Sequence, residues 1–496
     1  MVDFEPPLIL GIDIGTSGTK AIVFDSKGRK TKAKSTITYQ LKTPAKGAAE
    51  LDPEEVLSAI VGCCRETVRK SKRLHYGEIR AIGLSGFWHS LIAVGEEEKA
   101  LTPVYTWADT RSWPQSLKLR EEFQSNKVHE RTGCMLHPIY LPSKILWLKE
   151  ENKKIFQKTR LFCSMKEYLL LRLFGKTFCD FSIASGTGLL NIHTKEWDNE
   201  ILEYIGISSE QLSPLSNFDQ QIVGLKPRYS RWIGISPDVP WIIGSGDGAC
   251  SNIGSGCTSE EKLALMLGTS GAMRIMTRNQ NIKLPEGLWC YLVDQNYYLV
   301  GGAINNAGLV RSWLENTLKL PKDLESTIKK QRPTQHGLTF LPFLSGERCP
   351  GWKASAKASI LGLTFDTSSE EIFRAALESV GYRFLEIFGL MRNTFPDINE
   401  IVASGGILRS PEWMQIITDI LGTPLSVSNE GEASCLGAAI MAIKAIGMIK
   451  DYSIPEYNYA THSVFKPSKQ NHEIYMKAYK KFKICRQHGG IINGMD

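Results

Sequence analysis

Two stretches of the chain share one pattern, in which an apolar strand, a short polar turn and a second apolar strand follow one another. Residues 8–24 read LILGIDIGTSGTKAIVF, and residues 262–276 read KLALMLGTSGAMRIM. In both copies the turn is Gly-Thr-Ser-Gly, whose glycines permit the tight bend that joins two antiparallel strands. The pattern therefore predicts two β-hairpins, one in each half of the chain, and indicates that the halves are related.

Other apolar segments predict the elements between and after the hairpins. Residues 81–94 are typical of two strands that meet at a polar and aromatic corner, and residues 239–244 of a strand that runs into a glycine-rich turn. Residues 400–406 predict a buried strand that ends in a glycine turn, followed by a helix over 411–421. From 369 to 393 apolar positions recur at close to 3.6 residues, which predicts a long helix facing the core of the second half.

The length of 496 residues exceeds what a single hydrophobic core supports, so two domains are expected, over residues 1–254 and 255–496. Apolar residues make up 42% and charged residues 22%, which is the balance of a globular enzyme. No run approaches ~18 uninterrupted apolar residues, and the N-terminus lacks the basic and apolar regions of a secretion signal. We therefore expect neither a membrane-spanning protein nor a secreted one.

Charge and cysteine content narrow the class further. The net charge of +7 comes from scattered basic residues, so a nucleic-acid partner is not indicated, although a weak positive field suits an anionic substrate. The eleven cysteines include no Cys-x-x-Cys pair, and most lie among apolar or small residues. This favours reduced thiols in a cytoplasmic protein over disulfides or a zinc site.

The two glycine-rich turns have the composition of a phosphate-binding site. They expose backbone N–H groups and hydroxyls with no acidic side chain in the way, which an anionic phosphate requires. Neither turn opens a helix, which excludes a Walker P-loop and a dinucleotide fingerprint. Asp13 precedes the first turn by two residues, whereas Met266 stands at that place in the second copy. Only the first half therefore offers a carboxylate to a phosphate-bound Mg²⁺.

Three further segments accompany the hairpins, at residues 244–248, 301–308 and 404–413. With the hairpins, and in this order from about residue 8 to about residue 448, they resemble the carbohydrate kinases of the FGGY family. The resemblance implies an α/β fold of two ribonuclease-H-like domains in the actin-like arrangement, with the active site in the cleft between them. It also implies ATP-dependent phosphorylation of a hydroxyl of a small sugar or sugar acid, with ATP and Mg²⁺ as cofactors.

The resemblance assigns roles to residues at matching positions. Asp247, between two glycines after an apolar strand, is the implied catalytic base; the plain alternative is the N-cap of a helix that starts near Ala249. The nucleotide phosphates fall to both turns, and the adenosine end falls to glycines of the second half. The implied positions are Thr16, Ser17, Thr19, Gly268 and Thr269 for the phosphates, and Gly308, Gly405 and Gly406 for the adenosine end.

The implied sugar-binding positions lie in the first half of the chain, at Trp88, His89, Trp107, Asp109 and Arg111. Aromatic faces cover the C–H side of a sugar, while an imidazole, a carboxylate and a guanidinium bind its hydroxyls. Arg111 could also hold a substrate carboxylate in a two-pronged interaction. A lone Trp or His is more often structural, and it is the cluster that favours binding.

Several segments, most of them in the first half, resemble gluconate kinases more than xylulose, ribulose or glycerol kinases. These segments are residues 89–92, 106–112, 131–133 with 137–138, 166–168, 181–185 with 187–189, and 346–348. The substrate implied first is therefore D-gluconate, converted to 6-phosphogluconate. Two departures keep a ketopentose or polyol such as xylulose, ribulose, erythritol or glycerol open. Phe87 and Trp88 stand where gluconate kinases have small residues and a Met, and Cys349 delays their usual Pro.

A different class of function is a catalytically silent, actin-like nucleotide switch, which has no use for Asp247 or for the aromatic and charged corner at 87–111. A kinase excludes water by closing two domains over its substrate, so we expect a hinge near residues 253–261, in a stretch of small residues. Residues 451–496 carry no family motif. The implied partner is the small-molecule substrate, without membrane or nucleic acid, in a monomer or a homodimer.

Overall fold

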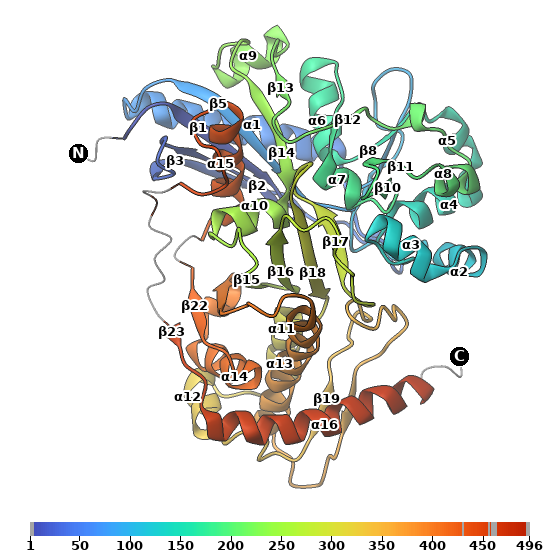
Figure 1. Cartoon of the computed structure of the whole chain (residues 1–496), viewed down its shortest axis with the longest axis vertical. Coiled ribbons are helices and arrows are strands. Elements are labelled where there is room, and N and C mark those ends of the chain that lie inside the picture. The colour runs from blue at the N-terminus through green and yellow to red at the C-terminus, as the bar shows by residue number, and fades with distance from the viewer. Residues whose placement is uncertain (1–3, 429–430, 455–456, 458–463, 493–496) are drawn as a thin grey trace.

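The protein forms two α/β lobes that lie one above the other along the long axis of the molecule (Figure 1). The computed structural model describes residues 4–428, 431–454, 457 and 464–492. Each lobe is built around its own mixed sheet, and each sheet contains one of the two predicted hairpins. The expected α/β fold of two related halves is therefore confirmed.

The sheet of the upper lobe has six strands, with the first hairpin at its centre. In spatial order they are β13 (Gln221–Ile222), β14 (Trp241–Gly246), β5 (Ile79–Gly86), β1 (Leu8–Ile14), β2 (Gly18–Phe24) and β3 (Lys30–Thr38). β1 pairs antiparallel with β2 and parallel with β5, and β14 is parallel to β5 on its other side. Because Gly86 is in register with both Ile14 and Gly246, the carboxyl ends of these three strands meet at one edge.

The sheet of the lower lobe has seven strands and repeats this arrangement. In spatial order they are β17 (Trp289–Leu292), β18 (Tyr298–Ile304), β16 (Gly271–Thr277), β15 (Lys262–Leu267), β21 (Glu400–Ser404), β22 (Leu425–Val427) and β23 (Val464–Phe465). As in the upper lobe, the first strand of the hairpin pairs antiparallel with its partner and parallel with a later strand, here β21. The internal repeat read from the sequence is thus a repeat of sheet topology.

Helices and short strand pairs fill the connections between these strands. The helices are α1 (Pro53–Arg73), α2 (Trp113–Glu122), α3 (Ser125–Thr132), α4 (Leu141–Glu151), α5 (Lys153–Lys158), α6 (Met165–Phe174), α7 (Phe181–Ser185), α8 (Asn199–Ile205), α9 (Pro227–Ile233), α10 (Asp247–Gly254), α11 (Gly308–Thr317), α12 (Leu324–Lys330), α13 (Ser369–Thr394), α14 (Pro411–Leu421), α15 (Ala433–Ala445) and α16 (Lys469–Ile492), with 3₁₀ turns at Ser209–Gln211 and Gly406–Arg409. The strand pairs are β4 (Glu50–Leu51) with β7 (Val104–Tyr105), β6 (Ile92–Val94) with β8 (Leu161–Cys163), β9 (Cys179–Asp180) with β12 (Leu215–Ser216), β10 (Leu190–Asn191) with β11 (Glu196–Trp197), and β19 (Thr339–Leu341) with β20 (Ser359–Leu361). No helix within the described ranges is long and apolar enough to cross a membrane.

The elements predicted from apolar patterns are confirmed. The corner at 81–94 joins β5 to β6, the strand before Asp247 is β14, and the glycine turn after β21 leads into α14. The long helix α13 ends one residue beyond the predicted end and begins at a capping box, in which Ser368 and Glu371 satisfy each other's backbone N–H groups. These elements were predictable because the residues within each element determine both the spacing of its apolar positions and the points where it begins and ends.

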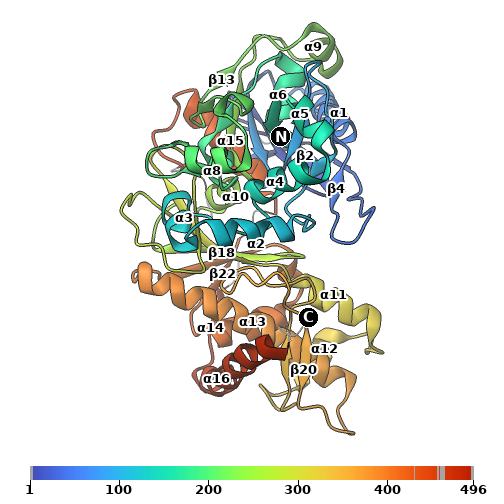
Figure 2. The same cartoon turned by 90° about the vertical axis from the view of Figure 1, so that its right-hand side faces the viewer.

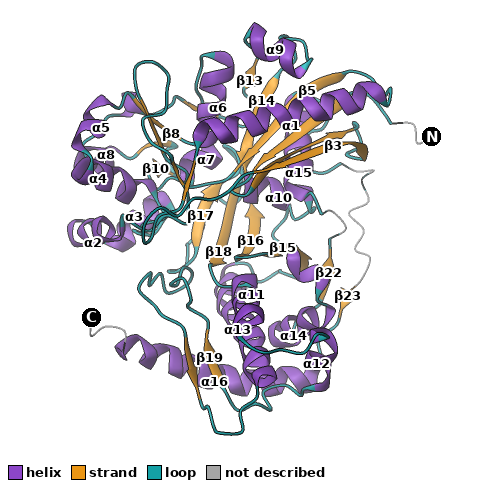
Figure 3. Ribbon diagram, turned by 180° about the vertical axis from the view of Figure 1, so that it is seen from behind, coloured by secondary structure: helices purple, strands orange, loops and turns teal. Residues whose placement is uncertain are grey.

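Helix α15 comes from the second half of the chain but packs in the upper lobe, between the sheet and α10 (Figure 1). Helix α1 covers the opposite face of this sheet (Figure 3). Glycines allow the close approach: a Cβ at Gly83 of β5 would overlap the carbonyl of Ala438, and one at Gly437 would overlap the carbonyl of Cys250 in α10. The domain boundary predicted between residues 254 and 255 stays a prediction. Helix α15 comes after this boundary in the sequence but is part of the upper lobe.

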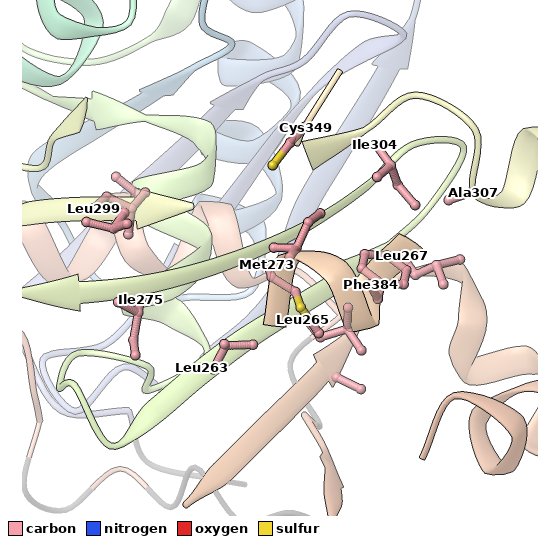
Figure 4. Close-up of a cluster of buried hydrophobic side chains, with 14 of the residues drawn as sticks. Leu263, Leu265, Leu267, Met273, Ile275, Leu299, Ile304, Ala307, Cys349 and Phe384 are labelled. Atoms are coloured by element: carbon pink, nitrogen blue, oxygen red, sulfur yellow. The ribbon is translucent and has the colours of Figure 1, made fainter. Parts of the chain in front are cut away.

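The core of the lower lobe surrounds the second hairpin (Figure 4). Leu265 of β15 and Met273 of β16 lie with Phe384 of α13 in one buried cluster. A side chain at Gly271, just after the turn, would overlap the ring of Phe384. The glycine-rich turn therefore lies directly on the hydrophobic core, which fixes its position.

Helix α16 lies beside α13 and α14 at the lower end of the molecule (Figure 2). Its Arg486 pairs with Glu347 at 3.0 Å and with Glu386 at 3.2 Å. Arg383 of α13 pairs with the same two carboxylates. The C-terminal helix, for which the sequence suggested no role, is thus connected by buried ion pairs to the loop that carries Glu347.

Candidate active site

A cavity of about 360 Å³ is lined by residues of both lobes, at the edge where the parallel strands of the upper sheet end. The start of α15 completes its wall. Seven residues expected from the sequence line this cavity: Asp13, Thr16, Trp88, His89, Trp107, Asp247 and Gly405. The structure therefore brings the expected base, the expected metal-binding carboxylate and three expected sugar-binding rings into one place.

Asp247 is the first residue of α10 and directly follows β14. Gly246 occupies the N-cap, and the Asp247 carboxylate accepts a hydrogen bond of 2.8 Å from the Gly248 amide. Burial, together with the negative charge of Asp13, raises the pKa of Asp247 to about 7, although the positive charge of Arg274 opposes this rise. A carboxylate with a pKa near neutrality is a better proton acceptor than an ordinary Asp.

Asp13 lies on β1, next to the first turn, and faces β5. Ser85 of β5, its register partner, donates a hydrogen bond of 2.8 Å to the Asp13 carboxylate. Burial raises the pKa of Asp13, and the Ser85 hydrogen bond and Lys20 oppose the rise. Asp13 thus offers a buried carboxylate in the cavity that a divalent cation at the phosphates could use.

The indole of Trp88 lies against the turn that carries Asp247. A Cβ at Gly246 or at Gly248 would overlap this ring, so both glycines are required by the close approach of the indole. The Trp88 indole N–H donates to the Ser182 carbonyl at 3.0 Å, which fixes the orientation of the ring. The aromatic surface is consequently held immediately beside the candidate base.

Rings from the lower lobe extend this aromatic wall. Trp289 and Tyr291 of β17 stack on each other with centroids 4.2 Å apart, and Trp88 meets Tyr291 edge to face at 5.2 Å. All three rings line the cavity. Such a wall can cover the C–H face of a sugar only when both lobes contribute.

His89 adds a polar group to the same wall. Its Nδ1 donates to the Gly186 carbonyl at 2.5 Å, and burial together with the charge of Arg348 lowers its pKa well below 6.5. The ring is therefore neutral, and its Nε2 has a free lone pair for a substrate hydroxyl. Lys144, which is fully buried, donates to the carbonyls of His89 and Thr106 and thereby holds the two sugar-side segments together.

Asp109 and Arg111 do not line the cavity, unlike Trp107 from the same segment. Arg111 donates to the Asp109 carboxylate at 2.6 Å and also pairs with Glu50. Its guanidinium lies over the ring of Trp147 at 4.7 Å. The two-pronged carboxylate interaction expected of Arg111 is therefore made with carboxylates of the protein itself, and this pair shapes the segment that presents Trp107.

The expected adenosine-side residues converge at the second turn. The Gly308 amide donates to the Gly268 carbonyl at 2.9 Å, and the Leu309 amide donates to the Thr269 carbonyl at 3.0 Å. Gly405 has a φ of 91°, which favours glycine, and lies against the Leu267 carbonyl. Gly406 follows at the start of a 3₁₀ turn. Of this group only Gly405 lines the cavity itself.

The expected residues of the first turn have different environments. Thr16 lines the cavity, whereas Ser17 is exposed at the tip of the hairpin. Thr19 is fully buried, and its hydroxyl shares a hydrogen bond of 3.2 Å with Tyr39, which also donates to the Gly15 carbonyl at 2.6 Å. Thr19 therefore holds the shape of the turn from within, and Thr16 is the one of these three residues that lines the cavity.

Four charged residues of the cavity were missed by the sequence reasoning. Lys20 of β2 and Glu432 at the start of α15 form an ion pair at 2.7 Å across the cavity wall. Arg274 of β16 is buried and donates to the Asn252 side chain at 3.0 Å. Arg348 lies on the loop between β19 and β20. Lys20 and Arg274 lie within the two hairpin motifs, and Arg348 lies in the segment 346–348 noted above, but the sequence does not show that these side chains reach the cavity.

Comparison with known proteins identifies the family. Residues 8–254 match the N-terminal domain, and residues 263–446 the C-terminal domain, of the FGGY family of carbohydrate kinases. The chain belongs to this family. It is therefore a carbohydrate kinase, a phosphotransferase with an alcohol group as acceptor.

Relatives of this FGGY kinase match it over nearly its whole length. A gluconokinase of Bacillus subtilis is 35% identical over 458 residues, which cover 90% of this chain and 88% of that protein. A crystal structure of gluconate kinase from Lactobacillus acidophilus has a TM-score of 0.90 at 30% identity and covers 97% of this chain and 98% of that one. Ligand-bound xylulose kinase from the same organism has a TM-score of 0.91 at 30% identity, with coverages of 98% and 99%. The overall fold thus does not distinguish a gluconate kinase from a xylulose kinase. Side chains of the site must make this distinction.

Proposed function

We propose that this kinase phosphorylates D-gluconate to 6-phosphogluconate with ATP and Mg²⁺ in the cytoplasm. The observation that carries the activity is Asp247, a carboxylate with a pKa of about 7 in a cavity lined by both lobes. The substrate is supported by the 35% identity to a gluconokinase over 90% of the chain. The buried free cysteines support a reducing compartment.

The protein's own groups account for positioning and proton transfer. The aromatic wall around Trp88 supports the carbon chain of the substrate, and the neutral His89 accepts a hydrogen bond from one of its hydroxyls. Asp247 takes the proton of the terminal hydroxyl as that oxygen attacks the phosphorus. The glycine-rich turns present backbone N–H groups to the phosphates.

The residues present fit a magnesium ion. Asp13 is the cavity carboxylate that is left for the ion, because Asp247 is the base and Lys20 already neutralises Glu432. No cluster of three or more potential protein ligands occurs within the described ranges, so water and phosphate oxygens would complete an octahedral shell. When bound, the ion neutralises charge on the transferred phosphoryl group.

Xylulose remains the second candidate, because a xylulose kinase matches the fold with a TM-score of 0.91. The large rings of Phe87 and Trp88, which both line the cavity, also suit a shorter substrate. Both candidates require the same base, and they differ in whether the substrate carries a carboxylate.

Substrate profiling tests this proposal. ADP release is measured with D-gluconate, xylulose, ribulose, glycerol and erythritol, for the wild type and for Asp247→Ala. D-Gluconate is expected to give the highest kcat/KM. The substitution is expected to lower kcat by about 10²- to 10⁴-fold, the range for loss of a general base.

Two results would count against the proposal. Turnover that survives Asp247→Ala would remove this residue from the mechanism. A kcat/KM for xylulose above that for D-gluconate would make the second candidate the substrate.

A further inference from the structure

Arg348 is a cavity cation without a partner. Its Nε is buried, and neither this atom nor the rest of its guanidinium makes a hydrogen bond or ion pair with the described residues. Its guanidinium carbon lies 6.0 Å from the ring centre of Trp107. The other two cations of the cavity wall are engaged, because Lys20 pairs with Glu432 and Arg274 bonds to Asn252. A buried polar group without a partner is costly unless a ligand satisfies it.

The neighbouring carboxylate cannot neutralise Arg348. Glu347 is directed to the lower lobe, where it pairs with Arg383 and with Arg486 at 3.0 Å. Arg383 also donates to the Cys349 carbonyl at 2.8 Å, which fixes the loop on both sides of Arg348. The ion pairs of this loop thus hold Glu347 away from the cavity wall that Arg348 lines.

The charge of Arg348 acts on two histidines, and one of them, His89, lines the cavity together with Arg348. Burial and the charge of Arg348 lower the pKa of His89 and of His137 well below 6.5, so both rings are neutral. The Ile139 amide donates to Nδ1 of His137 at 3.3 Å, which leaves the proton on Nε2, and Nε2 is buried without a partner in the described structure. His89 has the opposite tautomer, with a lone pair on Nε2.

These groups call for a particular ligand. Arg348 offers N–H donors to the cavity that lack acceptors, and His89 offers an acceptor that lacks a donor. A carboxylate accepts from the donors, and a hydroxyl on the adjacent carbon can donate to His89. The main causes of the shifted pKa of Asp247 are burial and the charges of Asp13 and Arg274, and Arg348 is not one of them.

We propose that Arg348 binds the carboxylate of an α-hydroxy sugar acid and selects such acids over neutral sugars. The inference rests on the proposed function, and it assigns the carboxylate end of the substrate to Arg348 and the reacting hydroxyl to Asp247. Arg348 is a specificity residue, and Trp107 and His89 position the substrate beside it.

Paired substrates test this assignment. D-Gluconate and D-glucitol differ only in the carboxylate, which is a hydroxymethyl group in D-glucitol. Affinity is measured by calorimetry, and kcat and KM by ADP release, for the wild type, Arg348→Met and Arg348→Lys. Arg80→Met, at the exposed start of β5, removes the same charge far from the cavity and is the control.

Arg348→Met is expected to lower the preference for D-gluconate over D-glucitol by about 10- to 100-fold, the effect of one charge-assisted pair, mainly through KM for D-gluconate. Arg348→Lys keeps the charge and is expected to restore part of this preference, and Arg80→Met to retain it. If Arg348→Met loses kcat/KM equally for both substrates, or raises only the KM for ATP, the assignment of Arg348 is wrong. Neither result would contradict the D-gluconate kinase activity of the wild type.

Other outcomes separate the two proposals. If the wild type uses another aldonate but not D-gluconate, and Arg348→Met removes its preference for that acid, the assignment of Arg348 holds and D-gluconate is wrong. If the wild type prefers xylulose to every acid tested, the assignment is wrong as well.

Discussion

Asp247 occupies a position in which reactivity and stability conflict. Its carboxyl group is buried beside Asp13 and close to the Trp88 ring, where ionisation is unfavourable, although the Gly248 amide at the helix start favours the charged form. This raises its pKa from 3.8 to about 7 and makes it a stronger base. When Asp247 is ionised, the folded protein therefore contains a negative charge in surroundings that disfavour it.

We predict that the Asp247→Asn variant is more stable than the wild type, and that this difference in stability grows as pH rises. Between pH 3.8 and about 7 the unfolded state has lost a proton that the folded state still holds, so wild-type stability falls across this window. The variant has no such group, and its advantage is expected to reach up to about 4 kcal/mol by pH 8. Thermal unfolding of both proteins at pH 5 and pH 8 measures the gap, and a gap that does not widen would contradict the prediction.

The residues of the site were predictable where a local motif marks them. Asp13 lies near the end of β1 and Asp247 directly follows β14, both beside characteristic glycines, and the structure places both in the cavity. Arg348 was not recognised as a site residue, because only the structure shows that its guanidinium lines the cavity without a hydrogen-bond partner among the described residues. Arg111 looked available for a carboxylate because the sequence does not reveal that Asp109 and Glu50 already bind it.

At the scale of elements, the contact between α10 and α15 links the base to the second half of the chain. The helices cross where Gly437 meets the Cys250 carbonyl, and Asp247 begins α10. The two hairpins were predictable from their own residues. The position of α15 was not, because an apolar helix carries no local signal for the sheet on which it packs.

We predict that Gly437→Ala destabilises the protein by about 1 to 3 kcal/mol, the range for overpacking, and lowers kcat by moving α10. Gly389→Ala is the matched control, since Gly389 is also in a helix but nothing lies within 4 Å of its added Cβ. This control is expected to be neutral or up to about 1 kcal/mol more stable. Chemical denaturation and kcat measure both effects, and equal behaviour of the two variants would argue against the contact.

At the scale of the whole molecule, the site exists only where the lobes meet. The rings of Trp289 and Tyr291 come from the lower lobe, and Trp88 and His89 from the upper one. The loop from α10 to β15 connects the lobes and coincides with the hinge predicted near residues 253–261. Closing the lobes would exclude water from the phosphoryl group.

We predict that the radius of gyration falls when D-gluconate and a non-hydrolysable ATP analogue bind together, because both lobes then contact ligands. Small-angle scattering with each ligand alone provides the controls, which are expected to show smaller changes. An unchanged radius with both ligands would be evidence against closure about this hinge.

The path of α15 also has a consequence for biosynthesis. The ribosome completes residues 1–254 about 180 residues before α15 begins, which at 5–20 residues per second is a delay of roughly 10 to 40 s. During this interval the nascent upper sheet lacks the helix that covers one of its faces, and the exposed apolar surface invites aggregation or a chaperone. A fragment cut at residue 254 is expected to remain in that state, with one face of its sheet uncovered.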